Sequence, residues 1–324
     1  MRVADSRSID LAYLFTLELH LITPKRITLS LAGQPQKPGS AKRLQALLAA
    51  GALQTKATQH EIYDQLEKRG NVAGERGVFV VTLATHGFND QGADFLVAAD
   101  SLRRRIERTG IAVNEIFDDV TRASAPRRLL FLDACRERLS ADTRKGGADP
   151  DSMMSEGLAK AIANTSGQVI LAGTTLGGYA YDDFVSMNGV FTAAIIDGLR
   201  GRAVPDKYNF ITARALADYV NQHVLDWVRR NRPEHVQLSQ GITITTGGPA
   251  AEIPLAMVSA STFEIPPSST ATTSLSSCKS ESQPGYLRRR KALVIGNGAY
   301  EVHTSGAWVK IPSVGGVSMI IKSN

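Results

Sequence analysis

Three short runs of apolar and β-branched residues dominate the hydrophobic pattern of this chain. They occupy residues 78–84, 128–132 and 168–173, and polar residues follow each of them. Nearly unbroken apolar runs of this length are typical of strands that are buried on both faces of a sheet. We therefore expect three central strands, each ending in a polar segment.

Helical patterns separate these runs. Apolar residues recur at helical spacing over residues 41–51 and 111–123, and the helix expected at Thr58–Arg69 begins with Thr58 as its N-cap and Glu61 at the capping-box position. Further helices are expected at 153–164, 189–201 and 212–230, and a last strand at 241–246. Helices alternating with strands predict an α/β fold: a doubly wound, mostly parallel sheet between two helical layers.

Composition divides the chain into four segments. Residues 1–40 have scattered Pro and Gly and weak periodicity, so we expect an irregular N-terminal segment. Residues 41–257 carry the α/β pattern. Residues 258–288 are rich in Ser, Thr and Pro, which is typical of a linker. In the last segment, 289–324, the stretch Lys291–Asn297 has the pattern of another buried strand.

Composition and charge exclude several classes of function. The two cysteines are too few for a disulfide framework or a structural zinc site, and the six histidines show no metal-ligand spacing. The net charge is +6, but the basic runs are short and lack interleaved aromatic residues, so we expect no nucleic-acid partner. No apolar run approaches the ~20 residues that span a bilayer. We expect a cytoplasmic protein without a membrane partner.

His86 and Cys135 follow directly after the first two predicted strands. In a doubly wound sheet, ligands bind outside the carboxyl ends of the strands, so we expect both residues on one rim. An imidazole beside a thiol can generate the thiolate and then protonate a leaving amine. Taken singly, each fits an inert buried thiol or an ordinary rim histidine. The pair favours cysteine peptidase chemistry.

The residues around this pair resemble the caspase-like peptidases of family C14, near the bacterial metacaspases and orthocaspases. The Cys lies in Asp-Ala-Cys-Arg, 49 residues after His86, and caspases place the histidine about 50 residues upstream of the nucleophile. The resemblance implies a caspase-like three-layer fold, His86 as general base and Cys135 as nucleophile. It also implies an oxyanion hole made by the backbone N–H groups of Gly87 and Cys135. The other matching segments are Asp94–Asp100, Gly189–Thr192 and Leu216–Val224.

The resemblance further implies a substrate preference. Caspases carry Gln two positions before the nucleophile, where it helps to hold a P1 aspartate, whereas this chain carries Asp133 there, as metacaspases do. A carboxylate at that position repels an acidic side chain and pairs with a guanidinium, so we expect cleavage after Arg or Lys. Asp94, in a metacaspase-like Gly-x-Asp sequence, is the candidate second acid of this S1 pocket. The alternative for Asp94 is a plain loop carboxylate.

The loop after Cys135 contains Arg138, Arg144 and Lys145. In a caspase-like domain it separates the large and small subunits, so self-cleavage at these residues is one expectation and a solvated charged loop is the other. Relatives often need calcium, yet no clear acidic cluster is visible, so no metal or cofactor is assigned and calcium activation stays open. The expected partner is a peptide or protein substrate, and the oligomeric state is not fixed.

One segment stands in an unusual place. Lys291–Tyr300 resembles the first strand of the family's domains almost letter for letter, but it follows the rest of the domain. It is the displaced strand of a circularly permuted domain, the start of a truncated second domain, or the product of a gene model that joins fragments. This irregularity keeps a second hypothesis open, a catalytically silent caspase-like scaffold or interaction module. A nucleotide-binding protein lacks support because no phosphate loop is visible.

Overall fold

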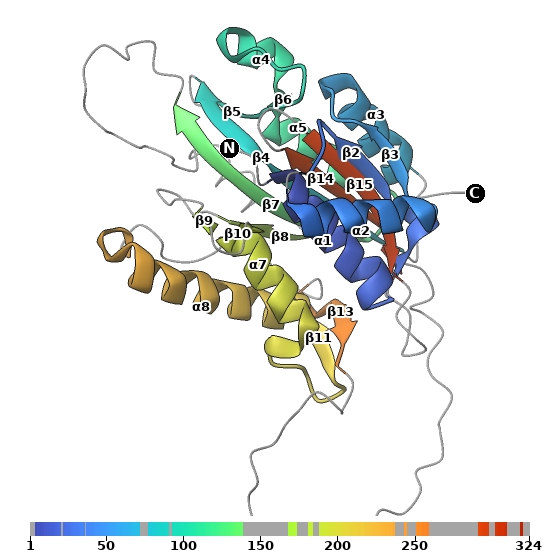
Figure 1. Cartoon of the computed structure of the whole chain (residues 1–324), viewed down its shortest axis with the longest axis vertical. Coiled ribbons are helices and arrows are strands. Elements are labelled where there is room, and N and C mark those ends of the chain that lie inside the picture. The colour runs from blue at the N-terminus through green and yellow to red at the C-terminus, as the bar shows by residue number, and fades with distance from the viewer. Residues whose placement is uncertain are drawn as a thin grey trace, which may run out of the picture.

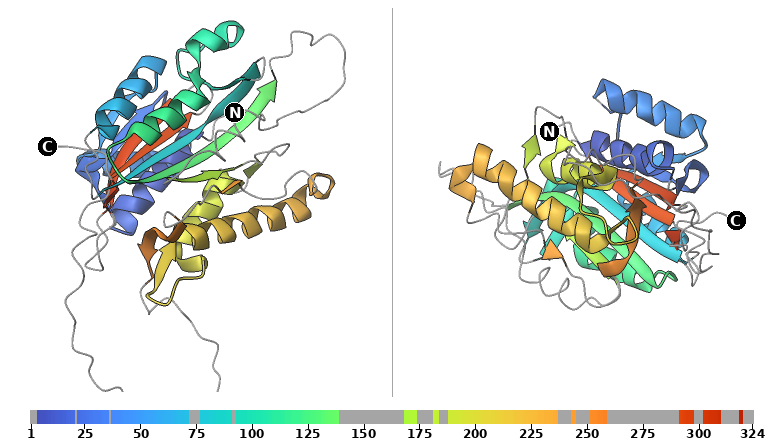
Figure 2. Two further views of the ribbon diagram at one scale, coloured as in Figure 1. Left: turned by 180° about the vertical axis from the view of Figure 1, so that it is seen from behind. Right: turned by 90° about the horizontal axis from the view of Figure 1, so that it is seen from below.

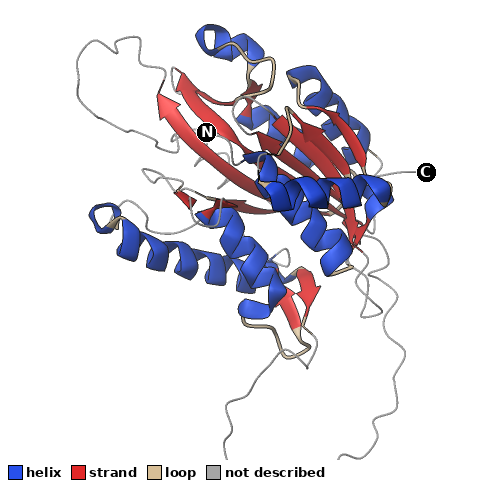
Figure 3. Ribbon diagram, in the orientation of Figure 1, coloured by secondary structure: helices blue, strands red, loops and turns tan. Residues whose placement is uncertain are grey.

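A mixed β-sheet runs through the middle of the molecule, with helices on both of its faces (Figures 1 and 3). The longest path through the sheet has the order β1-β15-β14-β4-β7-β8-β12. The computed structural model describes residues 4–20, 22–35, 37–71, 77–90, 93–138, 168–173, 181–183, 188–236, 243–244, 251–258, 291–297, 302–309 and 318–319. The expected α/β class and caspase-like three-layer architecture are confirmed.

The centre of the sheet is parallel. Strands β4 (Gly77–Asp90) and β7 (Arg127–Arg138) pair over their whole length, and β8 (Gln168–Ala172) pairs in parallel with β7. Antiparallel strands lie further out: β12 (Thr243–Ile244) on β8, and β15 (Val302–Val309) on β14 (Lys291–Asn297). The apolar residues of β4, β7 and β8 within the three predicted runs are buried, as expected for strands covered on both faces.

The predicted helices are present wherever they fall on described residues: α2 (Pro38–Ala49), α3 (Gln59–Gly70), α5 (Val113–Arg122), α7 (Val190–Asp197) and α8 (Ala213–Asn231). Thr58 caps α3 by accepting a hydrogen bond from the Glu61 N–H, as predicted. Helices α2 and α7 lie on one face of the sheet, and α3 and α5 on the other (Figures 1 and 2). Within the described ranges, no helix is long and apolar enough to cross a membrane.

The smaller elements connect this framework. They are β3 (Leu53–Lys56), β5 (Ala93–Leu96), η3 (Arg103–Arg105), α4 (Ile106–Thr109), β6 (Ile111–Ala112), β9 (Asp182–Asp183), β10 (Asn188–Gly189), η4 (Gly198–Arg202), β11 (Phe210–Thr212), η5 (Pro233–His235), β13 (Pro254–Met257) and β16 (Ser318–Met319).

The N-terminal segment is regular, which corrects the expectation for residues 1–40. Helix α1 (Ala4–Tyr13) continues into a π-helical turn, η1 (Leu14–Glu18), and is followed by β1 (Ile22–Thr23), the 3-10 turn η2 (Pro24–Arg26) and β2 (Thr28–Leu31). The helix packs its apolar residues into the core, and Ile9, Leu11 and Ala12 are buried. A helix enclosed on most sides lacks the polar stripe that makes amphipathic periodicity visible, so the pattern missed it.

Two central strands are longer than their apolar runs. We expected β4 to end before His86 and β7 before Cys135, but β4 continues to Asp90 and β7 to Arg138. The extension of β4 forms an antiparallel hairpin with β5, in which Gly87 pairs with Leu96. Polar residues begin at Thr85 in β4 and at Asp133 in β7, yet both strands continue, and Gly87 and Phe88 of β4 are buried. An apolar run stops at the first polar residues, whereas backbone pairing continues past them, and this is why the runs mark these strand ends too early.

Strand β14 is part of the main sheet. A strand was predicted at Lys291–Asn297, and it pairs in parallel with β4 through Lys291 and Phe79 and with β2 through Val294 and Leu29. Residues 259–290, which cover nearly all of the expected linker, and the helix expected at 153–164 lie outside the described residues.

Candidate active site

His86 and Cys135 stand directly opposite each other on neighbouring strands. They are register partners in the parallel ladder between β4 and β7. Adjacent strands lie about 4.8 Å apart, so the two backbone positions occupy one level of the sheet. Residues 78–85 of β4 are buried, whereas His86 is only half-buried. The two strands therefore place the base and nucleophile positions together at the margin of the buried core.

Strand β5 holds the backbone around His86. The His86 carbonyl accepts a hydrogen bond from the Val97 N–H at 2.9 Å. The hydroxyl of Thr85, which is itself buried, donates to the Val97 carbonyl at 2.9 Å. With β7 on its other side, the backbone at His86 is fixed from two directions. A catalytic base works best when its position is set before the substrate arrives.

Gly87 presents its backbone N–H towards β7. The bond from Val97 N–H to His86 makes Gly87 and Leu96 a non-hydrogen-bonded pair of the hairpin, so the Gly87 N–H points away from β5. On that other side lies β7, where Gly87 is the register partner of Arg136. The donor thus faces the strand of Cys135. In a regular parallel ladder the Gly87 N–H donates to a backbone carbonyl of β7. To bind an oxyanion instead, this N–H must be released, so β4 and β7 must separate beyond His86.

Asp133 is a buried carboxylate with two partners. The Arg7 Nη1 of α1 lies 3.2 Å from Asp133 Oδ1, and the side chains are only 7% and 3% exposed. The Thr192 hydroxyl of α7 donates to Asp133 Oδ2 at 2.5 Å. Gly189 packs against both members of the ion pair, because a Cβ at Gly189 would lie 2.8 Å from Arg7 Cζ and from Asp133 Oδ2. Positions 133 and 135 share one face of β7.

Sequence reasoning missed Arg7 altogether. The stretch Gly189–Thr192 carried a signal through its resemblance to the family, but Arg7 lies in a segment that showed no pattern. Its partner Asp133 is far along the chain, and the two meet only because α1 packs against β4 and β10 in the folded protein.

The structure does not bring Asp94 to Asp133. Asp94 is buried on β5 opposite Asn89, and Asp133 lies opposite Ala84. Since Gly87 pairs with both β5 and β7, these strands flank β4 on opposite edges. Two strand spacings and five residues along β4 separate the two carboxylates by roughly 15–20 Å. One P1 side chain cannot bridge that distance, which corrects the expectation that Asp94 is the second acid of the S1 pocket.

The expected self-cleavage residues lie at or beyond the end of β7. Arg138 is the last residue of β7, and Arg144 and Lys145 lie outside the described residues. For metal binding, a search of the described residues finds no group of three or more His, Cys, Asp or Glu side chains placed to hold an ion.

Comparison with known families gives one match. The family model of the caspase domain, peptidase family C14, matches residues 40–240, more than half of the chain. The match includes both His86 and Cys135, whereas α1 with Arg7 and strand β14 lie outside it. A search of curated proteins found no match.

Proposed function

Since the chain belongs to the caspase domain family, we propose that it is a cysteine endopeptidase with His86 as general base and Cys135 as nucleophile. The observation that carries this proposal is the register of β4 and β7, which sets these two positions opposite each other. A histidine and a cysteine at that spacing have the residue types that nucleophilic acyl transfer needs.

The proposed reaction follows from these roles. His86 accepts the thiol proton of Cys135, and the thiolate attacks the carbonyl carbon of the scissile peptide bond. The negative charge that develops on the carbonyl oxygen is stabilised by the N–H groups of Gly87 and Cys135, once the ladder beyond His86 has opened. The imidazolium then protonates the leaving amine, and water hydrolyses the thioester with His86 again acting as base.

We assign the S1 carboxylate to Asp133 alone. Its support is its position two residues before Cys135, on the face of β7 that position 135 shares. An anionic residue there favours cleavage after Arg or Lys, the preference of metacaspases. Caspases, which carry Gln at the position of Asp133, instead cleave after an acidic P1 residue.

A P1 library of fluorogenic peptides tests the proposal. We expect turnover of Arg and Lys peptides and no turnover of Asp peptides, in assays run with and without calcium. Cys135→Ala and His86→Gln should each lower kcat/KM by at least about a thousandfold, with little change in melting temperature. Cleavage that survives Cys135→Ala, or a preference for Asp at P1, would contradict the proposed site.

One observation favours a second function, a silent caspase-like scaffold. The ladder between β4 and β7 runs past His86 as far as Asn89 and Arg138. Pairing between the strands occupies backbone N–H groups that an oxyanion would need as donors. A peptidyl electrophile separates the two functions, because only a working thiolate reacts with it at once. Rapid labelling of Cys135 would exclude the scaffold, and its absence would exclude the peptidase.

Self-cleavage after Arg138, Arg144 or Lys145 extends the proposed function. These basic residues follow the nucleophile within ten positions and match the proposed P1 preference. Intact mass spectrometry after incubation should show two fragments for the native chain and one uncut chain for Cys135→Ala. If the native chain stays uncut but still hydrolyses peptides, self-cleavage is wrong and the loop is a solvated charged segment.

A further inference from the structure

Resting on the proposed function, we propose that Arg7 determines specificity: it occupies the Asp133 carboxylate, and a P1 Arg or Lys side chain binds only by displacing it. Arg7 lies outside the range that matches the caspase domain. No motif marked it, and its role follows from its contacts alone.

The carboxylate is fully engaged in this structure. Arg7 takes Asp133 Oδ1 and Thr192 takes Oδ2. Gly189 also packs so closely against the Arg7–Asp133 pair that even one added carbon at this residue would clash with both side chains. A second guanidinium would therefore have to share an oxygen that already has a partner. It would also meet the positive charge of Arg7, which opposes entry of another cation.

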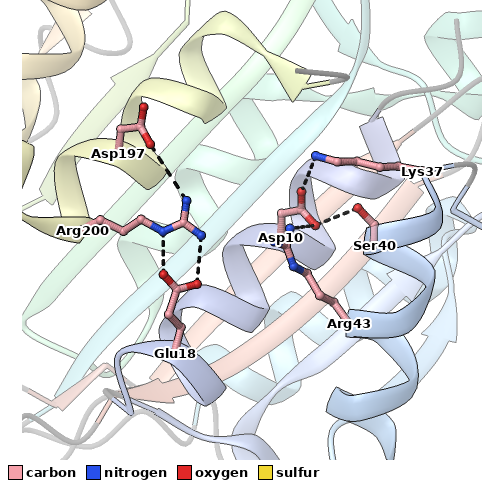
Figure 4. A network of polar contacts seen from close by, with 7 residues as sticks. All are labelled: Asp10, Glu18, Lys37, Ser40, Arg43, Asp197 and Arg200. Carbon is pink, nitrogen blue, oxygen red and sulfur yellow. Dashed lines mark hydrogen bonds and ion pairs between the residues drawn. The ribbon is translucent and has the colours of Figure 1, made fainter. Parts of the chain in front are cut away.

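Most of α1 is anchored independently of Arg7. The buried carboxylate of Asp10 binds Lys37 at 3.1 Å, Arg43 at 2.8 Å and the Ser40 hydroxyl at 2.7 Å, all on or beside α2 (Figure 4). At the far end, Glu18 accepts two hydrogen bonds from Arg200, which comes from η4 (Figure 4). These contacts lie after Arg7 in the sequence, so they hold the helix in place while its first turns move.

The first turns of α1 contain an unfavourable feature. The hydroxyls of Ser6 and Ser8, on either side of Arg7, are buried and have no hydrogen-bond partner among the described residues. Burying a hydroxyl without a partner is unfavourable, and opening this turn returns both groups to water. Helix ends also lack half of their internal hydrogen bonds. Opening can therefore release Arg7 without unfolding the rest of α1.

Displacement exchanges one ion pair for another. A P1 guanidinium that replaces Arg7 leaves Asp133 paired, which avoids the large penalty of an uncompensated buried charge. Arg7, once in solvent, regains its hydration. A neutral P1 side chain offers no such exchange and leaves Arg7 in place. Arg7 therefore raises KM for basic P1 residues and leaves KM for neutral ones unchanged.

The variant Arg7→Gln tests this prediction by kinetics. We expect KM for P1 Arg peptides to fall about tenfold or more while kcat stays constant, because the competitor for the carboxylate is gone. KM for P1 Ala peptides should not change, and Arg7→Lys should return KM for Arg peptides towards the native value. The exposed Arg214, paired with Glu252, supplies the control variant Arg214→Gln. A loss of activity that is equal for all P1 residues would overturn the proposal and leave Arg7 a structural residue.

Benzamidine tests the displacement without catalysis. It carries the charge of a P1 Arg but has no scissile bond, so its binding does not depend on His86 or Cys135. We expect benzamidine to raise the melting temperature of Arg7→Gln more than that of the native chain. In the native chain it should speed hydrogen exchange at residues 5–8 while residues 10–15 stay protected. Equal thermal shifts, or unchanged exchange at residues 5–8, would overturn the proposal even if the peptidase is active.

Discussion

His86 on β4 and Cys135 on β7 are partners in a single parallel ladder. A slip of one residue between these strands would move one of the two positions to the opposite face of the sheet. The register is set by the buried runs that precede the pair, in which Val80 pairs with Leu129 and Leu83 with Leu132. The packing of the core and the geometry of the candidate site are therefore determined together.

Gly189→Ala should destabilise the protein, because the added Cβ would lie 2.8 Å from both Arg7 and Asp133. Overpacking a well-filled site costs about 1–3 kcal/mol. Thermal unfolding measures this effect. Gly39→Ala in α2 is the matched control, since nothing lies within 4 Å of its added Cβ and Ala favours helix. Equal stability of the two variants would show that the Arg7–Asp133 pair tolerates an extra carbon.

Asp10→Asn should lower the free energy of unfolding by about 1.5–3 kcal/mol, the value of hydrogen bonds to a charged group. Asn keeps an oxygen for the Ser40 hydroxyl but loses the charge that pairs with Lys37 and Arg43. The loss stays moderate because these two cations are 22% and 32% exposed and can turn to water. Urea unfolding checks the prediction, with Glu252→Gln at an exposed ion pair as control. Equal midpoints for the two variants would contradict it.

The centre of the fold could be predicted because burial leaves a direct trace in sequence. Residues 78–81 and 169–172 are apolar because both faces of their strands are covered, and the cap at Thr58 uses only residues a few positions apart. The partnership of His86 with Cys135 followed from strand ends meeting at one rim, and the family resemblance strengthened it.

The rest depends on contacts that no local pattern encodes. Arg7 pairs with Asp133 only because α1 packs against β4 and β10, and α1 itself carried no visible amphipathic stripe. Asp94 was expected at the site because its sequence resembles the Gly-x-Asp of metacaspases. The hairpin instead places it on the edge of β4 away from β7. Which edge a neighbouring strand joins is decided by the whole sheet and not by its own residues.

Tyr63→Phe should destabilise the protein at neutral pH by about 1–2 kcal/mol. The Tyr63 hydroxyl donates to Glu115 Oε2 at 2.5 Å and accepts from the Ala112 N–H at 3.1 Å, so its removal breaks both hydrogen bonds. Tyr208→Phe is the control because Tyr208 is 64% exposed. Equal melting temperatures for the two variants at pH 8 would contradict this assignment.

The same hydroxyl should make the stability of the fold depend on pH in the alkaline range. The pKa of Tyr63 is raised above its ordinary value of 10.0. Burial is the larger cause, and the hydrogen bond to Glu115 is the second. Because the folded-state pKa is the higher one, the stabilisation is complete below pH 10 and is lost as pH rises towards the folded value. The difference in melting temperature between the native chain and Tyr63→Phe should therefore shrink from pH 8 to pH 11. A constant difference would contradict the raised pKa.

Deleting residues 291–324 should lower the melting temperature by at least about 5 °C, given several lost ladder bonds at 0.5–1.5 kcal/mol each and about 2–4 °C per kcal/mol. Strand β14 pairs with β4 through Lys291 and Phe79 and with β2 through Val294 and Leu29, so its removal opens an edge inside the sheet. We therefore propose that the domain is circularly permuted and that β14 is its displaced first strand, returned to the sheet.

The matched control keeps β14 and replaces residues 259–288 by a Gly/Ser sequence of equal length. A flexible segment of about 30 residues spans the molecule easily, so this variant should melt at the native temperature. If the deletion leaves the melting temperature unchanged, β14 contributes nothing to the sheet. Lys291–Tyr300 would then belong to a truncated second domain or a joined gene fragment. If both variants melt early, residues 259–288 themselves stabilise the fold, and their assignment as a linker is wrong.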